Sequence, residues 1–219
     1  MSENQRAVVF VNGVVENYGW IEPFLKPNDI LIAVDGGYRH MKALNLIPHL
    51  LIGDLDSVDE QDVKRLSALG VEIHKYPQEK DETDLEIVFL TARERGYSTL
   101  RVIGAFGGRM DHWLANLFAL THPAYAQMDI CYEDDQETAF IIRSEGVVNG
   151  NPGDLLSLIP MGGAVTGVRT EGLKYPLRDE TLYAHLSRGV SNEFLGGQAR
   201  VTIEEGLLLC IHLRTNSPA

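Results

Sequence analysis

The alternation of two kinds of segment most constrains the fold of the first part of this chain. Short apolar runs such as AVVFVNG (7–13) are followed by segments with helical spacing, such as MDHWLANLFAL (110–120). Because strands that alternate with helices at this spacing form parallel sheets, we expect an α/β domain whose sheet carries helices on both faces. The expected strands are residues 7–13, 29–37, 50–57, 71–77, 100–106 and 128–134.

Sequence signals mark the ends of several expected helices. Thr83 and Glu86 form a capping-box pattern, so a helix is expected to begin there and to run through DLEIVFLTARERG (84–96). The helix expected over 59–70 ends in a glycine, which commonly terminates helices. Helical spacing also predicts a helix at 38–46.

The pattern changes after about residue 136, where short β-type runs punctuated by Gly, Pro, Asn and Ser replace the alternation. Such runs are typical of an antiparallel β-sandwich or barrel. We therefore expect two domains, an α/β domain over 1–136 and a β domain over 137–219. The expected strands of the second domain include 155–160, 164–170, 198–206 and 207–213.

Composition and charge narrow the function. The 44% hydrophobic and 23% charged content is typical of soluble globular proteins, and no apolar run approaches the ~18 residues of a membrane helix. A net charge of −12 argues against a nucleic-acid partner. Asn12 and Gly13 interrupt the first apolar stretch, which we interpret as a strand and not a signal peptide. Cys131 and Cys210, far apart in apolar segments, are expected to be buried thiols in a reducing cytoplasm.

Acidic residues recur where the expected strands end. In LLIGDLDS (50–57), Asp54 and Asp56 are two positions apart, which on a strand would place both carboxylates on one face. Neighbouring carboxylates repel each other unless a cation lies between them, and Mg²⁺ prefers oxygen ligands. Asp35, Arg109 and Asp111 are expected at the same edge of the sheet, where ligands of α/β folds bind. A lone Asp at a strand end is commonly a turn former or a helix cap, but several together favour a metal-dependent phosphate site.

The segment KDETD (80–84) has two compatible interpretations. Thr83 is a good helix N-cap, and the helix dipole favours an acid at Asp84, which explains Asp84 structurally. The same helix start can also direct the carboxylate of Asp84 toward a metal ion. Asp81 precedes the cap and is interpreted as solvated or hydrogen-bonded to a ligand.

The segment GAFGGRMDH (104–112) combines glycines with an arginine at a strand-to-helix turn. Glycines such as Gly108 let backbone N–H groups approach a phosphate, and Arg109 can hold a phosphate through two hydrogen bonds. The segment is not a P-loop, because Lys followed by Ser or Thr is missing, and its glycine spacing is not that of a dinucleotide site. His112 is interpreted equally well as a structural residue at a helix start and as a ligand contact.

Other chemistries fit the sequence less well. DLDSV (54–58) resembles the nucleophile motif of haloacid-dehalogenase-type phosphatases. That family places its motif after the first strand, whereas two expected strands precede it here, and its later acidic motif is not matched. The sequence also lacks Cys/His groups with zinc-ligand spacing and the G-x-S-x-G elbow of serine hydrolases.

Taken in order, these motifs resemble those of the thiamine pyrophosphokinase family. The strings that carry the resemblance are DGG (35–37), GDLDS (53–57), KDETD (80–84), GGRMDH (107–112), LIPMGG, TEGLKYPL (170–177) and SNEF (191–194). The resemblance implies an α/β nucleotide domain followed by a β-sandwich, in a homodimer with composite active sites. It also implies Mg²⁺-dependent transfer of the β,γ-pyrophosphate of ATP to the hydroxyl group of thiamine, with release of AMP.

The resemblance also implies roles for individual residues. Mg²⁺ would be held by Asp54, Asp56 and Asp84. The ATP site would be lined by Asp35, Gly36, Asp81, Thr83, Gly108, Arg109, Asp111 and His112. Ser191 and Asn192 would contact thiamine, although both also fit turn positions before a strand. The role of Lys80 is left open, because some relatives carry a neutral residue there.

Two further alternatives stay open at this point. A pyrophosphokinase acting on another alcohol, such as a hydroxymethyl pterin, would use the same first half, whereas TEGLKYPL and SNEF favour thiamine. A thiamine or nucleotide sensor without catalysis is disfavoured by the intact acidic set. In the enzyme, Asp35 or Asp111 would accept the proton of the alcohol, and the sequence favours neither.

Overall fold

The computed structural model describes residues 5–77, 79 and 82–215. The chain divides into two compact units, which are Met1–Ala119 with Gln127–Asp134, and Leu120–Ala126 with Asp135–Ala219. Among the described residues, no helix is long and apolar enough to cross a membrane.

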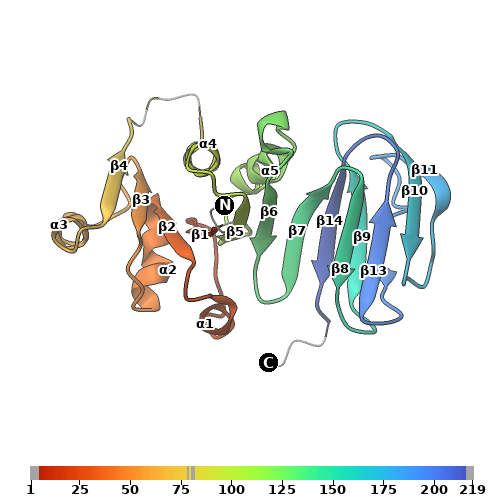
Figure 1. The fold of residues 1–219 in the computed structure, drawn as a ribbon, viewed down its shortest axis with the longest axis horizontal. Helices are drawn as coiled ribbons and strands as arrows, with labels where there is room; N and C mark the ends of the chain where they lie inside the picture. The colour runs from red at the N-terminus through yellow and green to blue at the C-terminus, as the bar shows by residue number, and fades with distance from the viewer. Residues whose placement is uncertain (1–4, 78, 80–81, 216–219) are drawn as a thin grey trace. The chain divides into compact units, whose positions relative to one another are not determined.

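The first unit is built on six parallel strands in the order β6-β5-β1-β2-β3-β4 (Figure 1). The chain adds strands outward from β1 to β4, and then returns to the other side of β1 for β5 and β6. The direction of winding therefore reverses between β1 and β5, which is where ligands bind in such sheets. The strands are β1 (Arg6–Phe10), β2 (Ile30–Val34), β3 (Leu50–Gly53), β4 (Glu72–Lys75), β5 (Thr99–Ile103) and β6 (Asp129–Glu133).

The predicted helix signals of the first unit are confirmed. Thr83 and Glu86 form the capping box, in which Glu86 N donates to Thr83 Oγ1 at 3.2 Å and Thr83 N donates to Glu86 Oε2 at 2.8 Å. The helix predicted for 38–46 ends earlier, at Ala43, because the backbone turns at Asn45 with a φ of 54°. The helices are α1 (Ile21–Phe24), α2 (Tyr38–Ala43), α3 (Glu60–Ala68), α4 (Asp84–Glu94) and α5 (Met110–Ala119), and a 3-10 turn, η1 (Asp35–Gly37), precedes α2.

The buried strands explain why the apolar runs predicted the sheet. Val8 and Phe10 of β1 alternate with Val9, and all three are completely buried. Val8 and Phe10 pack with Ile21 of α1 and with Leu66 of α3 in one core cluster. Because successive side chains of a strand face opposite sides, Val9 belongs to the other face. The sheet is thus covered on both faces, as predicted.

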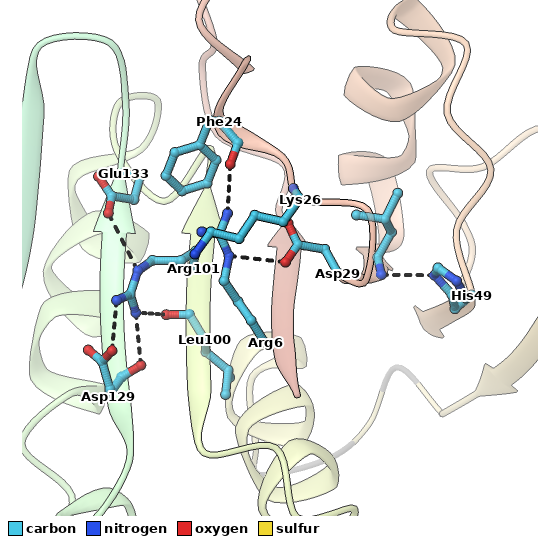
Figure 2. Close-up of polar contacts among 10 residues, drawn as sticks. Arg6, Phe24, Lys26, Asp29, His49, Leu100, Arg101, Asp129 and Glu133 are labelled. Carbon is cyan, nitrogen blue, oxygen red and sulfur yellow. Dashed lines mark hydrogen bonds and ion pairs between the residues drawn. The ribbon is translucent and has the colours of Figure 1, made fainter. Parts of the chain in front are cut away.

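A network of paired charges runs along β1, β5 and β6, from Arg6 and Asp129 at the amino ends to Glu133, the last residue of β6 (Figure 2). Arg6 Nε lies 3.2 Å from Asp29 Oδ1, and its guanidinium stacks over the Phe24 ring at 4.4 Å. Arg101 Nη2 lies 2.7 Å from Asp129 Oδ2, and Arg101 Nε lies 3.7 Å from Glu133 Oε1. These pairs neutralise charged side chains that the strands carry into the domain.

The second unit consists of two antiparallel sheets, with strand orders β12-β9-β14-β7 and β11-β10-β13-β8. Side chains of both sheets share one core cluster, for example Leu156 and Cys210 from one sheet and Val168 and Val201 from the other. The predicted β-sandwich is therefore confirmed. The strands are β7 (Glu137–Ile142), β8 (Glu145–Asn149), β9 (Leu155–Pro160), β10 (Val165–Glu171), β11 (Arg178–Leu182), β12 (Asn192–Glu193), β13 (Gln198–Thr202) and β14 (Leu208–Leu213).

Both cysteines are buried thiols, as predicted. Cys131 on β6 is 5% exposed and Cys210 on β14 is fully buried. Burial raises the pKa of the Cys131 thiol, and also that of Cys210, well above the ordinary value. Both thiols are therefore expected to remain protonated and unreactive at neutral pH.

Candidate active site

A cavity of about 650 Å³ lies in the first unit, at the carboxyl ends of β1, β2 and β5. The starts of α4 and α5 complete its lining. Its position coincides with the reversal of winding between β1 and β5. The predicted site residues that line it are Asp35, Thr83, Asp84, Gly108, Arg109, Asp111 and His112.

The loops after β1 and β5 form one wall of the cavity. The sequence analysis did not predict that the loop after β1 belongs to the site. Gly13 N donates to Gly104 O at 2.8 Å, which joins the two loops. A Cβ atom at Gly13 would lie 2.0 Å from the same oxygen, so only glycine allows this close approach. The available sequence signal for this loop was the string VNG (11–13) after the first strand. The string indicates a ligand-binding loop only once β1 is known to lie where the direction of winding reverses.

Two side chains of α2 form hydrogen bonds with the backbone carbonyls of the Asn12–Gly13 loop. Arg39 Nη2 donates to Gly13 O at 2.7 Å and to Asn12 O at 3.1 Å. His40 Nε2 lies 3.0 Å from Gly13 O, and His40 Nδ1 lies 2.8 Å from Tyr18 Oη. Because a carbonyl only accepts, Nε2 carries the proton and Nδ1 accepts from Tyr18. Burial, with a contribution from Arg39, lowers the pKa of His40, which favours this neutral form.

Asp35 lies at the centre of an acidic cluster. It directly follows β2, has a φ of 44°, and its Oδ1 accepts a hydrogen bond from Leu55 N at 2.9 Å. A Cβ atom at Gly53 would lie 1.9 Å from that Oδ1, so the glycine makes room for the carboxylate. Burial, with a hydrogen bond to Asp84 and repulsion from Asp84 and Asp54, raises the pKa of Asp35 to about 7. The structure thus gathers three of the predicted carboxylates.

The stated reason for pairing Asp54 with Asp56 is wrong. Strand β3 ends at Gly53, so both residues lie in the following loop and do not share a strand face. Leu55 has a φ of 65°, and Asp56 N donates to Asp54 Oδ1 at 3.0 Å. Asp54 is half-buried beside Asp35, whereas Asp56 is exposed, and neither belongs to the cavity lining.

The remaining predicted residues of the first half take different positions. Gly36 is buried and packs against the Asn12 side chain, not against the cavity. Thr83 caps α4, and this places Asp84 at the first position of the helix beside Asp35. Asp81 and Lys80 lie outside the described residues.

The start of α5 provides the cation of the cavity wall. The side chains of Arg109 and Asp111 are 74% and 64% exposed, and Arg109 Nη2 lies 2.5 Å from Asp111 Oδ2. Hydrogen bonding between them raises the pKa of Arg109 and lowers that of Asp111, so both are charged at neutral pH. His112 is exposed and follows them on the helix. An exposed guanidinium can exchange its carboxylate partner for a phosphate.

The acidic cluster fits a hard cation by its chemistry. Within the described residues, no group of three or more His, Cys, Asp or Glu side chains is arranged to hold a metal ion. Asp35, Asp54 and Asp84 nevertheless offer oxygen ligands only, and their mutual repulsion is what a divalent cation would relieve.

Ser191 and Asn192 lie in the second unit. Ser191 directly precedes the short strand β12, and Asn192 is its first residue. Ser191 is exposed, has a φ of 57°, and its N donates to Ser157 Oγ at 3.0 Å. Asn192 is only 8% exposed, and its amide is engaged with the backbone of Tyr175. Ser191 is therefore accessible to a ligand, whereas the Asn192 side chain has a structural use.

Comparison with known proteins adds family information to this geometry. Residues 21–132 match the family model "Thiamin pyrophosphokinase, catalytic domain", and residues 141–208 match "Thiamin pyrophosphokinase, vitamin B1 binding domain". The thiamine pyrophosphokinase of Bacillus subtilis is 28% identical over 186 residues, which cover 82% of this chain and 85% of the relative. That of Oryza sativa (pyrophosphokinase 1) is 27% identical and covers 76% and 67%.

Solved structures of thiamine pyrophosphokinases have the same fold as this chain. The crystal structure of a thiamin pyrophosphokinase family protein from Enterococcus faecalis has a TM-score of 0.83 at 25% identity, covering 97% of this chain and 100% of that one. The Bacillus subtilis thiamine pyrophosphokinase structure, at 23% identity, has a TM-score of 0.85 and covers 96% and 99%, which supports the fold. Because the catalytic model alone spans half of its length and the vitamin B1 model follows in order, this chain belongs to the thiamine pyrophosphokinase family of enzymes.

Proposed function

We propose that the protein transfers the pyrophosphoryl group of ATP to the hydroxyl group of thiamine, giving thiamine diphosphate and AMP. The observation that carries the proposal is the cavity at the β1–β5 reversal, which combines an acidic cluster with Arg109 and glycine backbone. Family membership supplies the two substrates. The haloacid-dehalogenase alternative loses its support, because GDLDS follows the third strand and not the first.

ATP would lie in the cavity of the first unit. The N–H groups around Gly107 and Gly108, both with a φ of 74°, can approach phosphate oxygens closely. Arg109 would pair with a phosphate in place of Asp111. Thr83 and His112 line the same cavity. The resemblance also implies Gly36, which packs behind Asn12, and Asp81, which lies outside the described residues.

Magnesium would be held by Asp54, Asp56 and Asp84. When bound, the ion would neutralise phosphate charge and so favour attack on phosphorus. Asp56 is exposed, and its backbone N donates a hydrogen bond to Asp54 Oδ1. Its carboxylate would therefore be the solvent-exposed member of the three. Asp35 stands beside Asp84 and would be affected by the same charge.

The chain's own residues would align the reactants and move one proton. Attack by the thiamine hydroxyl oxygen on the β-phosphorus forms the new P–O bond, while the bond between the α- and β-phosphates breaks and AMP leaves. The proton of the hydroxyl would pass to Asp35 or Asp111, both of which line the cavity. Arg109 would stabilise the negative charge that builds up on the phosphate oxygens.

The direct test is incubation with ATP, Mg²⁺ and thiamine, followed by identification of both products. We expect AMP and thiamine diphosphate in equal amounts. Formation of ADP with thiamine monophosphate would refute pyrophosphoryl transfer. Turnover with a hydroxymethyl pterin alone would favour the other pyrophosphokinase, and binding without turnover would favour a sensor.

The active protein is further proposed to be a homodimer whose sites combine residues of two chains. Helix α5 supports this, since Met110, Leu114 and Phe118 are 71%, 40% and 55% exposed and follow one another at four-residue spacing on one face. The same helix carries Asp111 and His112 of the cavity, so a second chain covering the apolar face would approach the nucleotide.

Subunit mixing tests the composite site. An inactive Asp54→Asn chain and an inactive Ser191→Ala, Asn192→Ala chain, mixed with exchange of subunits, should regain part of the activity. One of the two sites in a mixed dimer would then be intact. No recovery despite measured exchange would mean that each chain builds its own site.

A cytoplasmic location is proposed on the state of the cysteines. Cys131 and Cys210 are free thiols, as is usual where glutathione keeps proteins reduced. Cell fractionation with an antibody against the protein would test this.

A further inference from the structure

The loops after β1 and β5 remain joined beyond the ends of their strands. Gly13 N donates to Gly104 O at 2.8 Å, and Val14 N donates to Phe106 O at 3.2 Å. These backbone bonds continue the pairing of the two parallel strands into the wall of the cavity. A displacement of the loop after β1 would therefore displace the loop after β5 as well.

The loop after β5 leads directly into the phosphate turn, residues 107–109, whose N–H groups and guanidinium are proposed to bind ATP. A Cβ atom at Gly107 would lie 3.1 Å from the Cβ atom of Val14, so the loop after β1 packs closely against this turn. Gly107 also has a φ of 74°, which favours glycine. The loop after β1 therefore fixes one side of the phosphate turn.

Helix α2 holds the loop after β1 through a single carbonyl group. Gly13 O accepts from Arg39 Nη2 at 2.7 Å and from His40 Nε2 at 3.0 Å. A carbonyl oxygen has two lone pairs, so both acceptor positions of Gly13 O are filled. The His40 residue is 2% exposed, and its Nδ1 lies 2.8 Å from Tyr18 Oη. Breaking this buried contact would leave polar groups without partners.

Helix α2 is a firm support for the loop, because its start packs directly on β1. A Cβ atom at Gly37 would lie 2.1 Å from Phe10 O. Tyr38 and Met41 are 3% and 0% exposed and belong to the core cluster that contains Phe10. The core thus fixes the helix, and the helix fixes the loop.

We propose that Arg39 and His40 are positioning residues for the phosphates of ATP, which act through Gly13 O on the phosphate turn. Neither side chain belongs to the cavity lining, so both act on the nucleotide through the backbone. Tyr18 supports His40 by donating to Nδ1, which keeps the proton on Nε2 for Gly13 O. The inference rests on the proposed function in taking ATP as the ligand of the cavity.

Equilibrium binding of α,β-methylene-ATP, which the proposed reaction does not cleave, tests the inference on the full-length protein with Mg²⁺. In isothermal titration calorimetry, Arg39→Met and His40→Leu should each raise the Kd about 3- to 10-fold, as expected for the loss of one hydrogen bond. His40→Gln should keep the Kd near the wild-type value, because its amide nitrogen can donate to Gly13 O. In steady-state kinetics, the KM for ATP should rise in the first two variants and the KM for thiamine should not.

Lys42→Met is the matched control for the loss of a cation from α2. Lys42 is exposed on the same helix, but its Nζ lies 2.6 Å from Asp62 Oδ2 of α3. The Kd for the analogue should therefore stay at the wild-type value. A rise in Lys42→Met as large as in Arg39→Met would overturn the specific role of Gly13 O.

Amide hydrogen exchange separates positioning from a general loss of stability. In Arg39→Met and His40→Leu, the amides of Gly13 and Val14 should exchange faster, while those of the buried strand β2 should keep their wild-type rates. Equally faster exchange throughout the first unit would show that the variants only destabilise the fold, and would overturn the positioning role. Arg39 is exposed, so Arg39→Met keeps the test decisive if His40→Leu does not fold.

The outcomes separate this inference from the proposed function. An unchanged Kd in Arg39→Met and in the folded His40→Leu would overturn the inference, whether or not the wild type makes thiamine diphosphate. A wild type that binds the analogue but makes no thiamine diphosphate would overturn the proposed function alone. A wild type that does not bind the analogue would overturn both.

Discussion

The two ends of the parallel sheet treat charge in opposite ways. Toward the amino ends of the strands, arginines pair with carboxylates, as Arg6 does with Asp29 and as Arg101 does with Asp129. At the carboxyl ends, the charged groups that act on Asp35 are two other carboxylates, Asp54 and Asp84, and they raise its pKa to about 7. The first arrangement pairs opposite charges within the protein, whereas the repulsion in the second would be relieved by the cation that we propose to bind there.

This difference separates stability from function within one domain. Removing a partly buried arginine that has two acidic partners lowers the stability of the native state, because the acidic side chains are then left without their counter-charge. Carboxylates gathered against their mutual repulsion destabilise the native state, and such a cost is typical of a site built for a ligand. Changes at the two ends are therefore expected to alter different quantities.

The largest effect is expected for the proposed magnesium residues. Asp54→Asn, Asp56→Asn and Asp84→Asn should each lower kcat by roughly 10³-fold or more, because the charge that holds the cation is lost. Folding should survive, since repulsion is relieved. Asp59→Asn is the matched control, because Asp59 caps α3 and asparagine caps equally well. Near-normal kcat in the three site variants would remove the metal assignment.

In the network of paired charges, Arg101→Met should lower the free energy of unfolding by about 3 kcal/mol, because Asp129 and the buried Glu133 lose this cation. The kcat of the folded protein should stay unchanged. Urea unfolding followed by tryptophan fluorescence measures this, since Trp20 and Trp113 both belong to the first unit.

A more exposed ion pair provides the control for this variant. Arg95→Met breaks the pair of Arg95 with Glu72, whose side chains are 29% and 48% exposed, and should cost less than about 1 kcal/mol. Equal losses in Arg101→Met and Arg95→Met would show that burial of the network adds nothing.

A smaller effect with the opposite sign is expected for Asp35→Asn in metal-free protein. The pKa of Asp35 is about 7 in the native state against an ordinary 3.8, so the native state retains a proton that the unfolded chain loses. The free energy of unfolding therefore falls as the pH rises from about 4 to about 7. Asp35→Asn should stabilise the protein by roughly 1–2 kcal/mol at pH 8 and not at pH 4, after allowance for partial exposure.

Thermal unfolding in EDTA at both pH values measures this difference. Asparagine keeps the oxygen that accepts from Leu55 N and tolerates the positive φ, so the local structure should persist. An Asp35→Asn variant less stable than the wild type at pH 8 would contradict the repulsion at this edge.

The smallest effect concerns the cap that positions Asp84. Thr83→Ala removes the hydroxyl that accepts from Glu86 N and should cost about 1 kcal/mol of unfolding free energy. Thr83→Ser should keep both stability and kcat. If Thr83→Ala also lowers kcat at temperatures where the variant is folded, the capped start of α4 positions Asp84.

Much of the fold could be predicted from local patterns. The apolar runs predicted the strands because residues such as Val8 and Ile52 are buried within the sheet, and Thr83 with Glu86 marked a helix start. The sandwich followed from short runs between turn residues. The two-residue strand β12 could not be predicted, because it is defined by pairing with β9 and not by its own composition.

The candidate site was predicted less completely. Asp35, Asp84 and Arg109 were predicted to lie together because several charged residues recur near strand ends, and the structure places all three in the lining of one cavity. His40 and Arg39 were missed, since their contacts to the Asn12–Gly13 loop depend on tertiary structure. The loop at Leu55 was misjudged, because its positive φ occurs at a residue type that gives no such signal.

Cation binding tests the comparison most directly. Mn²⁺, followed by electron paramagnetic resonance, can be titrated in the presence of a non-hydrolysable ATP analogue into wild-type, Asp84→Asn and Arg101→Met proteins. The account predicts equal binding by the wild type and Arg101→Met, and at least about 10-fold weaker binding by Asp84→Asn. Undiminished binding by Asp84→Asn would contradict the claim that the carboxyl end of the sheet, unlike its amino end, is built for a cation.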